Sequence, residues 1–195
     1  MAQEPLTNTT KLIIIGGSSG SLEALLVMLP LFKTTFNIPV ILVLHRSNNP
    51  DNGLAQLLAA RTNLQVKEAD EKDSLQPGWI YIAPPDYHLL VEEDGTLSLD
   101  QSEKVNYCRP SIDVSFISAA EAYKDRLTAV LLSGANADGA AGMKMVKICG
   151  GNNIVQDPAS AQVSYMPQQA LLVAPIDDVA SPEAIAHLLN GITGL

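Results

Sequence analysis

Cysteine is almost absent from this sequence of 195 residues, which contains only Cys108 and Cys149, far apart in the chain. A disulfide framework needs more cysteines than this and is excluded, and a structural zinc site is disfavoured for the same reason. The three histidines do not supply the missing ligands, because no two have metal-ligand spacing and no H-x-E or H-E-x-x-H motif occurs. We therefore expect no metal site and interpret both cysteines as buried or half-buried thiols.

Basic residues are also scarce, with 12 Lys and Arg against 21 Asp and Glu and a net charge of −9. No basic run occurs, so the chain lacks the electrostatic signature of a nucleic-acid-binding protein. No apolar run reaches the roughly 18 residues that span a bilayer, and residues 1–10 lack the pattern of a signal peptide. We expect a protein of the cytoplasm without membrane insertion. The hydrophobic fraction of 47% excludes disorder as the main state.

Apolar β-branched runs alternate with helical patterns along almost the whole chain. We predict strands at residues 11–15, 39–44, 65–68, 79–83, 127–132 and 153–156. We predict helices at residues 22–29, 51–61, 111–123, 138–149, 167–173 and 182–189, the last with Ser181 as its N-cap. Residues 88–91 and 96–99 flank Asp94-Gly95 and predict one antiparallel hairpin, either an excursion or an edge of the sheet.

This alternation predicts an α/β fold with a single doubly wound, mostly parallel sheet and helices on both faces. One domain over residues 1–195, with an ordered core at about 11–189, is the expected organisation, since neither a linker nor an internal repeat is present. In such sheets ligands bind beyond the carboxyl ends of the strands.

Three of these strand ends carry residues suited to acyl transfer. The first strand runs into Gly16-Gly17-Ser18-Ser19-Gly20, the second ends at His45, and residues 133–139 after a third contain Asp138. A hydroxyl nucleophile needs a base, and the imidazole needs a carboxylate that orients it and stabilises its charged form. The glycine-rich turn matches G-x-S-x-G between a strand and a helix.

Other interpretations of the same residues remain open at this point. Ser18 and Ser19 could simply cap the helix that follows them, and Asp138 could cap the helix after it. A dinucleotide fingerprint is disfavoured, because Ile15 replaces a required glycine and His45 stands where an acid is expected. His88 and His187 are interpreted as structural.

Together, seven motifs resemble the catalytic domain of CheB, the chemotaxis protein-glutamate methylesterase, from about residue 11 to residue 189. They are IIIGGSSGSLEAL, VLHR, WIYIAPPDYH, CRPSIDVSF, LLSGANADGAAGM, QDPASA and YMPQQAL. The resemblance implies hydrolysis of glutamate γ-methyl esters on a methylated chemoreceptor-like protein, with release of methanol and no metal or organic cofactor. It also implies possible deamidation of receptor glutamines by the same residues.

The resemblance implies roles for six residues. Ser18 would be the nucleophile, His45 the general base and acid, and Asp138 the carboxylate that orients it. By the same resemblance, Ser19 would line the site and the backbone N–H of Ala135 would contribute to the oxyanion hole. Arg109 would lie near the cleft.

The sequence departs from the family at Ser21, Arg46 and residues 135–137, which leaves substrate preference open. A serine esterase for another ester and a non-catalytic binding module are the alternatives. Typical CheB proteins carry an N-terminal receiver domain. Only about ten residues precede the first predicted strand here, so we expect no receiver domain and regulation, if any, by a separate receiver protein in trans.

Overall fold

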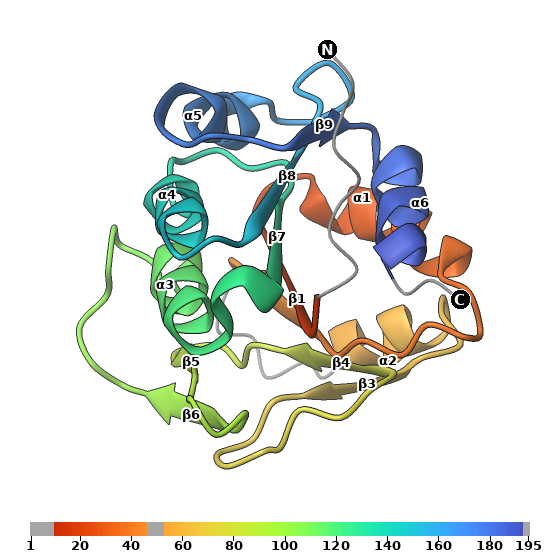
Figure 1. Cartoon of the computed structure of the whole chain (residues 1–195), viewed down its shortest axis with the longest axis vertical. Helices are drawn as coiled ribbons and strands as arrows, with labels where there is room; N and C mark the ends of the chain where they lie inside the picture. The colour runs from red at the N-terminus through yellow and green to blue at the C-terminus, as the bar shows by residue number, and fades with distance from the viewer. Residues whose placement is uncertain (1–9, 47–52, 193–195) are drawn as a thin grey trace.

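The computed structural model describes residues 10–46 and 53–192, which form a seven-stranded sheet between two layers of helices (Figure 1). All pairs of neighbouring strands in it are parallel, in the order β3-β4-β2-β1-β7-β8-β9. The strands are β1 (Leu12–Gly17), β2 (Val40–Leu44), β3 (Gln65–Glu68), β4 (Trp79–Ile82), β7 (Leu127–Leu131), β8 (Asn152–Gln156) and β9 (Asp178–Ala180). This confirms the predicted fold class.

The central strands are apolar throughout because helices cover both of their faces. Every residue of β1, β2 and β7 is buried. Successive side chains of β1 point to opposite faces, so Ile14 joins one hydrophobic cluster and Ile13 the other. This double burial explains why these strands are continuous hydrophobic runs rather than alternating ones.

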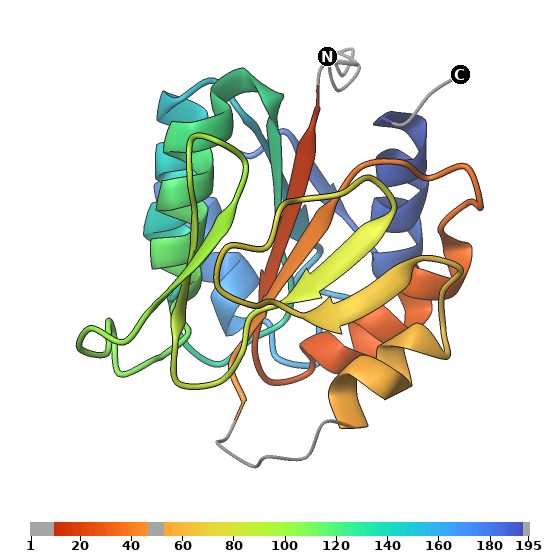
Figure 2. The same cartoon turned by 90° about the horizontal axis from the view of Figure 1, so that it is seen from below.

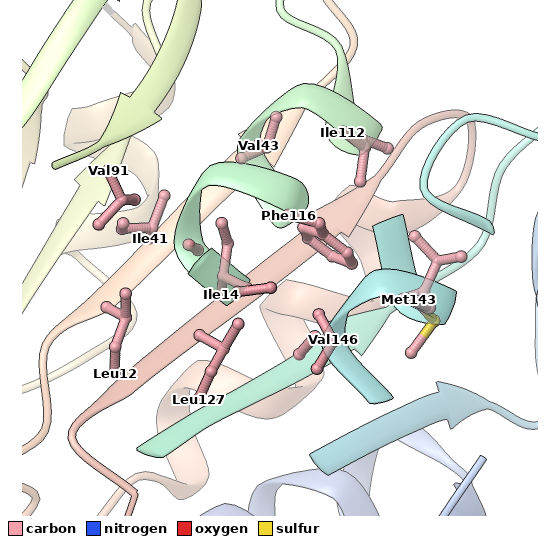
Figure 3. Close-up of a cluster of buried hydrophobic side chains, with 14 of the residues drawn as sticks. Leu12, Ile14, Ile41, Val43, Val91, Ile112, Phe116, Leu127, Met143 and Val146 are labelled. Carbon is pink, nitrogen blue, oxygen red and sulfur yellow. The ribbon is translucent and has the colours of Figure 1, made fainter. Parts of the chain in front are cut away.

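Helices cover both faces of the sheet (Figures 1 and 2). α3 (Ile112–Tyr123), α4 (Ala140–Ile148) and α5 (Tyr165–Val173) lie on one side, and α1 (Ser21–Met28), α2 (Gly53–Ala59) and α6 (Pro182–Ile192) on the other. Figure 3 shows the first cluster, where Phe116 of α3 and Val146 of α4 pack over Ile14. No helix of the described ranges is both long and apolar enough to cross a bilayer.

The predicted hairpin forms a separate two-stranded antiparallel sheet, β5 (His88–Val91) with β6 (Leu97–Asp100). It is therefore an excursion rather than an edge of the large sheet. Leu89, Val91 and Leu97 bury their side chains in the same cluster as Phe116, so the hairpin extends the layer that α3 begins.

Several predicted boundaries were wrong for local reasons. β1 continues through Gly17, and Pro30 lies inside a 3₁₀ turn, η1 (Leu29–Leu31), that follows α1. A second such turn, η2 (Lys124–Arg126), follows α3, and β9 was not predicted at all. The capping of α6 was predicted correctly, since the Ala184 amide donates to Ser181 Oγ over 3.4 Å. The predicted start of the second helix, at residues 50–51, lies outside the described residues.

Candidate active site

The register of the two central strands places Ser18 and His45 side by side. Gly17, the last residue of β1, pairs with Leu44, the last residue of β2. Ser18 and His45 therefore each follow directly after their strand. Neighbouring strands are about 4.8 Å apart, and the His45 amide donates to the Gly17 carbonyl over 3.2 Å. Ser18 is half-buried, and its hydroxyl makes no hydrogen bond to His45 within residues 10–46 and 53–192.

The turn after β1 does not use its serines to cap α1. Gly20 occupies the N-cap position with a φ of 81°, a conformation that glycine adopts at little cost, and no side chain caps the helix there. Ser21 Oγ instead donates to the Ser18 carbonyl over 2.6 Å. Ser19 is exposed, and its carbonyl accepts a hydrogen bond from Ser133 Oγ. The capping interpretation of Ser18 and Ser19 is therefore wrong.

His45 is held by Asp138, whose carboxylate Oδ2 lies 2.7 Å from His45 Nε2. The Asp138 side chain is 0% exposed and that of His45 only 13% exposed. An ionised carboxylate can only accept, so Nε2 carries the proton in this pair and Nδ1 keeps the lone pair of the neutral ring. Cys108 Sγ lies 3.7 Å from that Nδ1.

Asp138 also caps a helix, but not the one that the sequence suggested. Its two oxygens accept hydrogen bonds from the backbone amides of Ile112 (2.7 Å) and Asp113 (3.0 Å) and from Ser111 Oγ (2.9 Å), at the start of α3. The N-cap of α4 is Gly139, without a side-chain cap. The prediction that Asp138 caps its own helix was thus wrong.

These contacts set the charge of Asp138. Burial alone would raise its pKa, but the hydrogen bonds from His45, from the two amides and from the Ser111 hydroxyl outweigh burial and lower the pKa below its ordinary value. The carboxylate is therefore ionised at neutral pH. A fixed negative charge at this position can orient the imidazole and stabilise the imidazolium that forms when the ring accepts a proton during acyl transfer.

Asp113 caps the other helix and was missed at the sequence level. Its Oδ1 accepts from the Gly139 amide (2.9 Å) and the Gly142 amide (2.7 Å) at the start of α4. Burial, together with the neighbouring charge of Asp138, raises the pKa of Asp113 to about 6. An acidic residue in the first turn of a predicted helix was the only available signal, and such residues are common.

The two helix starts pack closely on the ends of the strands. Gly139 has a φ of 98°, and a Cβ atom there would lie 2.8 Å from Ile112 Cγ2 and 2.7 Å from Leu131 Cδ1. A side chain at Gly16 would approach Ile112 Cγ2 to 2.4 Å. Glycine at both positions lets α3 and α4 begin directly above β1 and β7, where Asp138 can reach His45.

A pocket of about 390 Å³ opens beside His45. It is lined by His45, Arg46, Asp86, Lys104, Tyr107, Cys108, Arg109 and Pro110. Arg46 pairs with Glu68 and also donates to the Ala83 carbonyl. These contacts largely neutralise Arg46, so it adds little positive charge to the pocket.

Arg109 lies at this pocket, as expected, but it is also tied to the protein. Its Nη1 donates to the carbonyls of Gln101 and Ser102, both over 2.8 Å, and its Nη2 lies 3.9 Å from Asp86. Ala135 is exposed, and its N–H donates no hydrogen bond to any residue that the structure describes.

One group of side chains has the ligand types of a metal site. The candidate ligand atoms of His45, Cys108 and Asp138 lie within 4.8 Å of one another. The oxygens of Asp138 already accept four hydrogen bonds, and burial together with the Asp138 charge raises the pKa of the Cys108 thiol. Because thiol ligands bind metals as thiolates, this arrangement suits proton transfer through His45 better than metal binding.

His88 and His187 lie apart from this group. His88 is buried, its Nε2 donates to the Glu103 carbonyl (3.0 Å), and its Nδ1 accepts from the Ser111 amide (3.2 Å). His187 is exposed on α6. The structural role expected for His88 is confirmed, because the residue is buried and both of its ring nitrogens are hydrogen-bonded.

Comparison with known proteins identifies the family. The model of the CheB methylesterase domain matches residues 13–189. This chain belongs to the CheB methylesterase family. The crystal structure of the CheB methylesterase catalytic domain from Thermotoga maritima is similar with a TM-score of 0.89 and 33% identity, over 94% of this chain and 98% of that one.

Curated relatives of this CheB-family chain differ in length. A Leptospira interrogans protein is 44% identical over 90% of this chain and 91% of its own length. The Thermotoga maritima protein-glutamate methylesterase/protein-glutamine glutaminase is 36% identical, and the Myxococcus xanthus protein-glutamate methylesterase FrzG is 37% identical. They align with 83% and 86% of this chain, which spans only about half of their length (48% and 50%).

Proposed function

We propose that this chain hydrolyses glutamate γ-methyl esters on a methyl-accepting chemoreceptor-like protein and releases methanol. The observation that carries the proposal is the His45–Asp138 hydrogen bond of 2.7 Å, directly beside Ser18 at the ends of adjacent strands. The names of the Thermotoga and Myxococcus relatives support the choice of substrate. We further propose that residues 1–195 form one CheB-type catalytic domain with its ordered core at about 11–189.

In the proposed reaction Ser18 Oγ attacks the ester carbonyl carbon, and its proton moves to His45 Nδ1. The adjacent strand ends place Ser18 beside His45, and the hydrogen bond between the two side chains would form when substrate binds, since catalytic hydrogen bonds often tighten only in the complex. The ionised Asp138 stabilises the imidazolium. Collapse of the tetrahedral intermediate breaks the C–O bond, and methanol leaves with the proton from His45.

Water then attacks the acyl-enzyme with His45 again as base, which regenerates Ser18 and leaves a glutamate. For a receptor glutamine, the same steps would release ammonia instead of methanol. The backbone N–H groups of Ser19 and Ala135 are proposed to bind the developing oxyanion. In support, neither N–H donates a hydrogen bond to the described residues. Arg109 is proposed to shape the pocket by holding the loop around residue 102.

The test compares Ser18→Ala with Ser19→Ala, a matched control one residue along the same turn. We expect Ser18→Ala to lose about 10⁴-fold or more in kcat for methanol release from a methylated receptor fragment, and Ser19→Ala to keep most of it. A fluorophosphonate should label the Ser19→Ala protein but not the Ser18→Ala protein.

A Ser18→Ala protein that still turns over would contradict the assignment of the nucleophile. Wild-type protein that reacts with the fluorophosphonate and hydrolyses p-nitrophenyl acetate, but not the receptor ester, would indicate a serine esterase for another substrate. Wild-type protein that fails to react with either would indicate a binding module. Control by a separate receiver protein stays a prediction.

A further inference from the structure

A two-residue turn at the mouth of the pocket has an unfavourable sequence. Val105 and Cys108 pair as an antiparallel bridge through two backbone hydrogen bonds, of 3.2 and 2.9 Å. The residues between them, Asn106 and Tyr107, have φ values of 51° and 63°. Two positive φ values define a type I′ turn, in which asparagine suits the first position and glycine the second. Tyr107 therefore holds a strained conformation where glycine would fit better.

This turn presents the Tyr107 side chain to solvent. Tyr107 is 97% exposed, more than any other large hydrophobic residue of the described chain. The base of the turn is fixed, because Asn106 Nδ2 donates to Asp113 Oδ2 over 3.4 Å and the backbone of Cys108 is paired with that of Val105. The ring thus gains almost no burial within the fold to offset the strain.

The Tyr107 side chain lies at the edge of the pocket, where a bound substrate protein would contact it. Tyr107 lines the same pocket as His45, and its chain neighbour Cys108 touches the imidazole. Strained non-glycine residues with no internal contact are concentrated at functional sites. A tyrosine on a fixed turn offers a large contact area at low entropic cost, and tyrosine is enriched among the residues that dominate binding energy.

The charges beside the ring fit an acidic partner. Of the three basic residues at the pocket, Arg46 is paired with Glu68 and Arg109 lies near Asp86. The third, Lys104, is exposed and forms no ion pair within the described part of the chain. A carboxylate of a bound protein segment can therefore pair with Lys104 while an apolar side chain of the same segment packs on Tyr107.

We propose that Tyr107 is the docking residue for the acidic segment of the substrate protein that flanks the methylated glutamate. This inference rests on the proposed function, since it assigns a specificity-determining residue to that reaction. A small ester reaches Ser18 without touching a flanking segment. Replacing Tyr107 should therefore raise KM for the protein substrate and change KM for a small ester far less.

The experiment measures kcat and KM of Tyr107→Ala, Tyr107→Gly and Tyr107→Phe on a methylated receptor fragment and on p-nitrophenyl acetate. We expect KM for the receptor to rise about tenfold in the Ala and Gly variants and to stay near wild type in Phe. The loss in kcat/KM should be several times larger on the receptor than on the small ester. Leu172→Ala, which removes a side chain 75% exposed near the end of α5, is the matched control.

Thermal unfolding separates docking from a structural role. Tyr107→Gly relieves the strained turn and should raise Tm by about 2–4 °C while it weakens receptor binding. Unchanged receptor KM in the Ala and Gly variants would overturn the proposal, and so would equal losses on both substrates. If wild-type protein hydrolyses p-nitrophenyl acetate but releases no methanol from the receptor, the proposed substrate is wrong and the docking role falls with it.

Discussion

Replacing Asp113 by asparagine should stabilise the protein at neutral pH. Asparagine keeps an oxygen that can accept from the Gly139 and Gly142 amides, both of which donate to Oδ1 in the wild type. Its amide group resembles the protonated carboxyl and can donate to Asp138, and it loses only the long hydrogen bond of 3.4 Å that Oδ2 accepts from Asn106 Nδ2. The substitution therefore removes a buried charge beside another carboxylate while keeping the cap of α4.

The size of the effect follows from the pKa of Asp113. Folding raises it from 3.8 to about 6, and a difference of about 2 pH units corresponds to about 3 kcal/mol. Between these two pH values the native state keeps a proton that the unfolded chain has released. The free energy of unfolding therefore falls as pH rises from about 4 to about 6, and stays lower above that. Asp113→Asn lacks this decrease.

Urea unfolding of both proteins between pH 4 and pH 8 tests the argument. The two should be nearly equal in stability at about pH 4, and the variant should be more stable by about 2–3 kcal/mol at pH 7.5. Asp125→Asn, which removes an exposed carboxylate from η2, controls for the change in net charge. Parallel curves for wild type and Asp113→Asn, or a less stable variant at pH 7.5, would refute the reasoning.

Three other substitutions test the surroundings of His45. Asp138→Asn should lower kcat for methanol release by about 10⁴-fold, because an amide can donate to the imidazole and favour the wrong tautomer; near-normal turnover would contradict this. Gly139→Ala should lower the free energy of unfolding, measured in urea, by about 2 kcal/mol or more, because φ is positive there and the Leu131 side chain is close. An unchanged unfolding midpoint would contradict the need for glycine at this position. Cys108→Ala should raise kcat about 2–5-fold by removing a thiol that competes with Ser18 for Nδ1, and a decrease would assign the thiol a supporting role.

The central strands and the two helical layers around them could be predicted, because strands buried on both faces are apolar throughout. β1, β2 and β7 are apolar on both faces, and only a sheet between two helical layers requires that. β9 could not be predicted, because its residues are all partly or fully exposed and it joins the sheet through backbone pairing with β8. Backbone pairing at an edge leaves little trace in the side chains.

The sequence predicted that Ser18, His45 and Asp138 follow the carboxyl ends of three strands. What each group contacts could not be predicted, because that depends on how the chain returns from other elements. The Cys108 thiol reaches His45 only because the segment before α3 passes over the end of β2. The turn at Asn106 and Tyr107 was missed because it lacks the glycine by which such turns are recognised.

The capping of α3 and α4 shows most clearly why local rules failed here. A capping rule assigns an aspartate to the helix that follows it. Asp138 lies just before α4 but accepts hydrogen bonds from the first amides of α3. Asp113 lies in α3 but accepts hydrogen bonds from amides at the start of α4. Each helix therefore receives part of its N-terminal capping from the other, although Ser111 Oγ also accepts from the Val114 amide within α3. Since the same Asp138 carboxylate also holds His45, the orientation of the imidazole depends on the packing of these two helices, which are far from β2 in the sequence. A substitution that separates α3 from α4 should therefore impair catalysis before it unfolds the sheet.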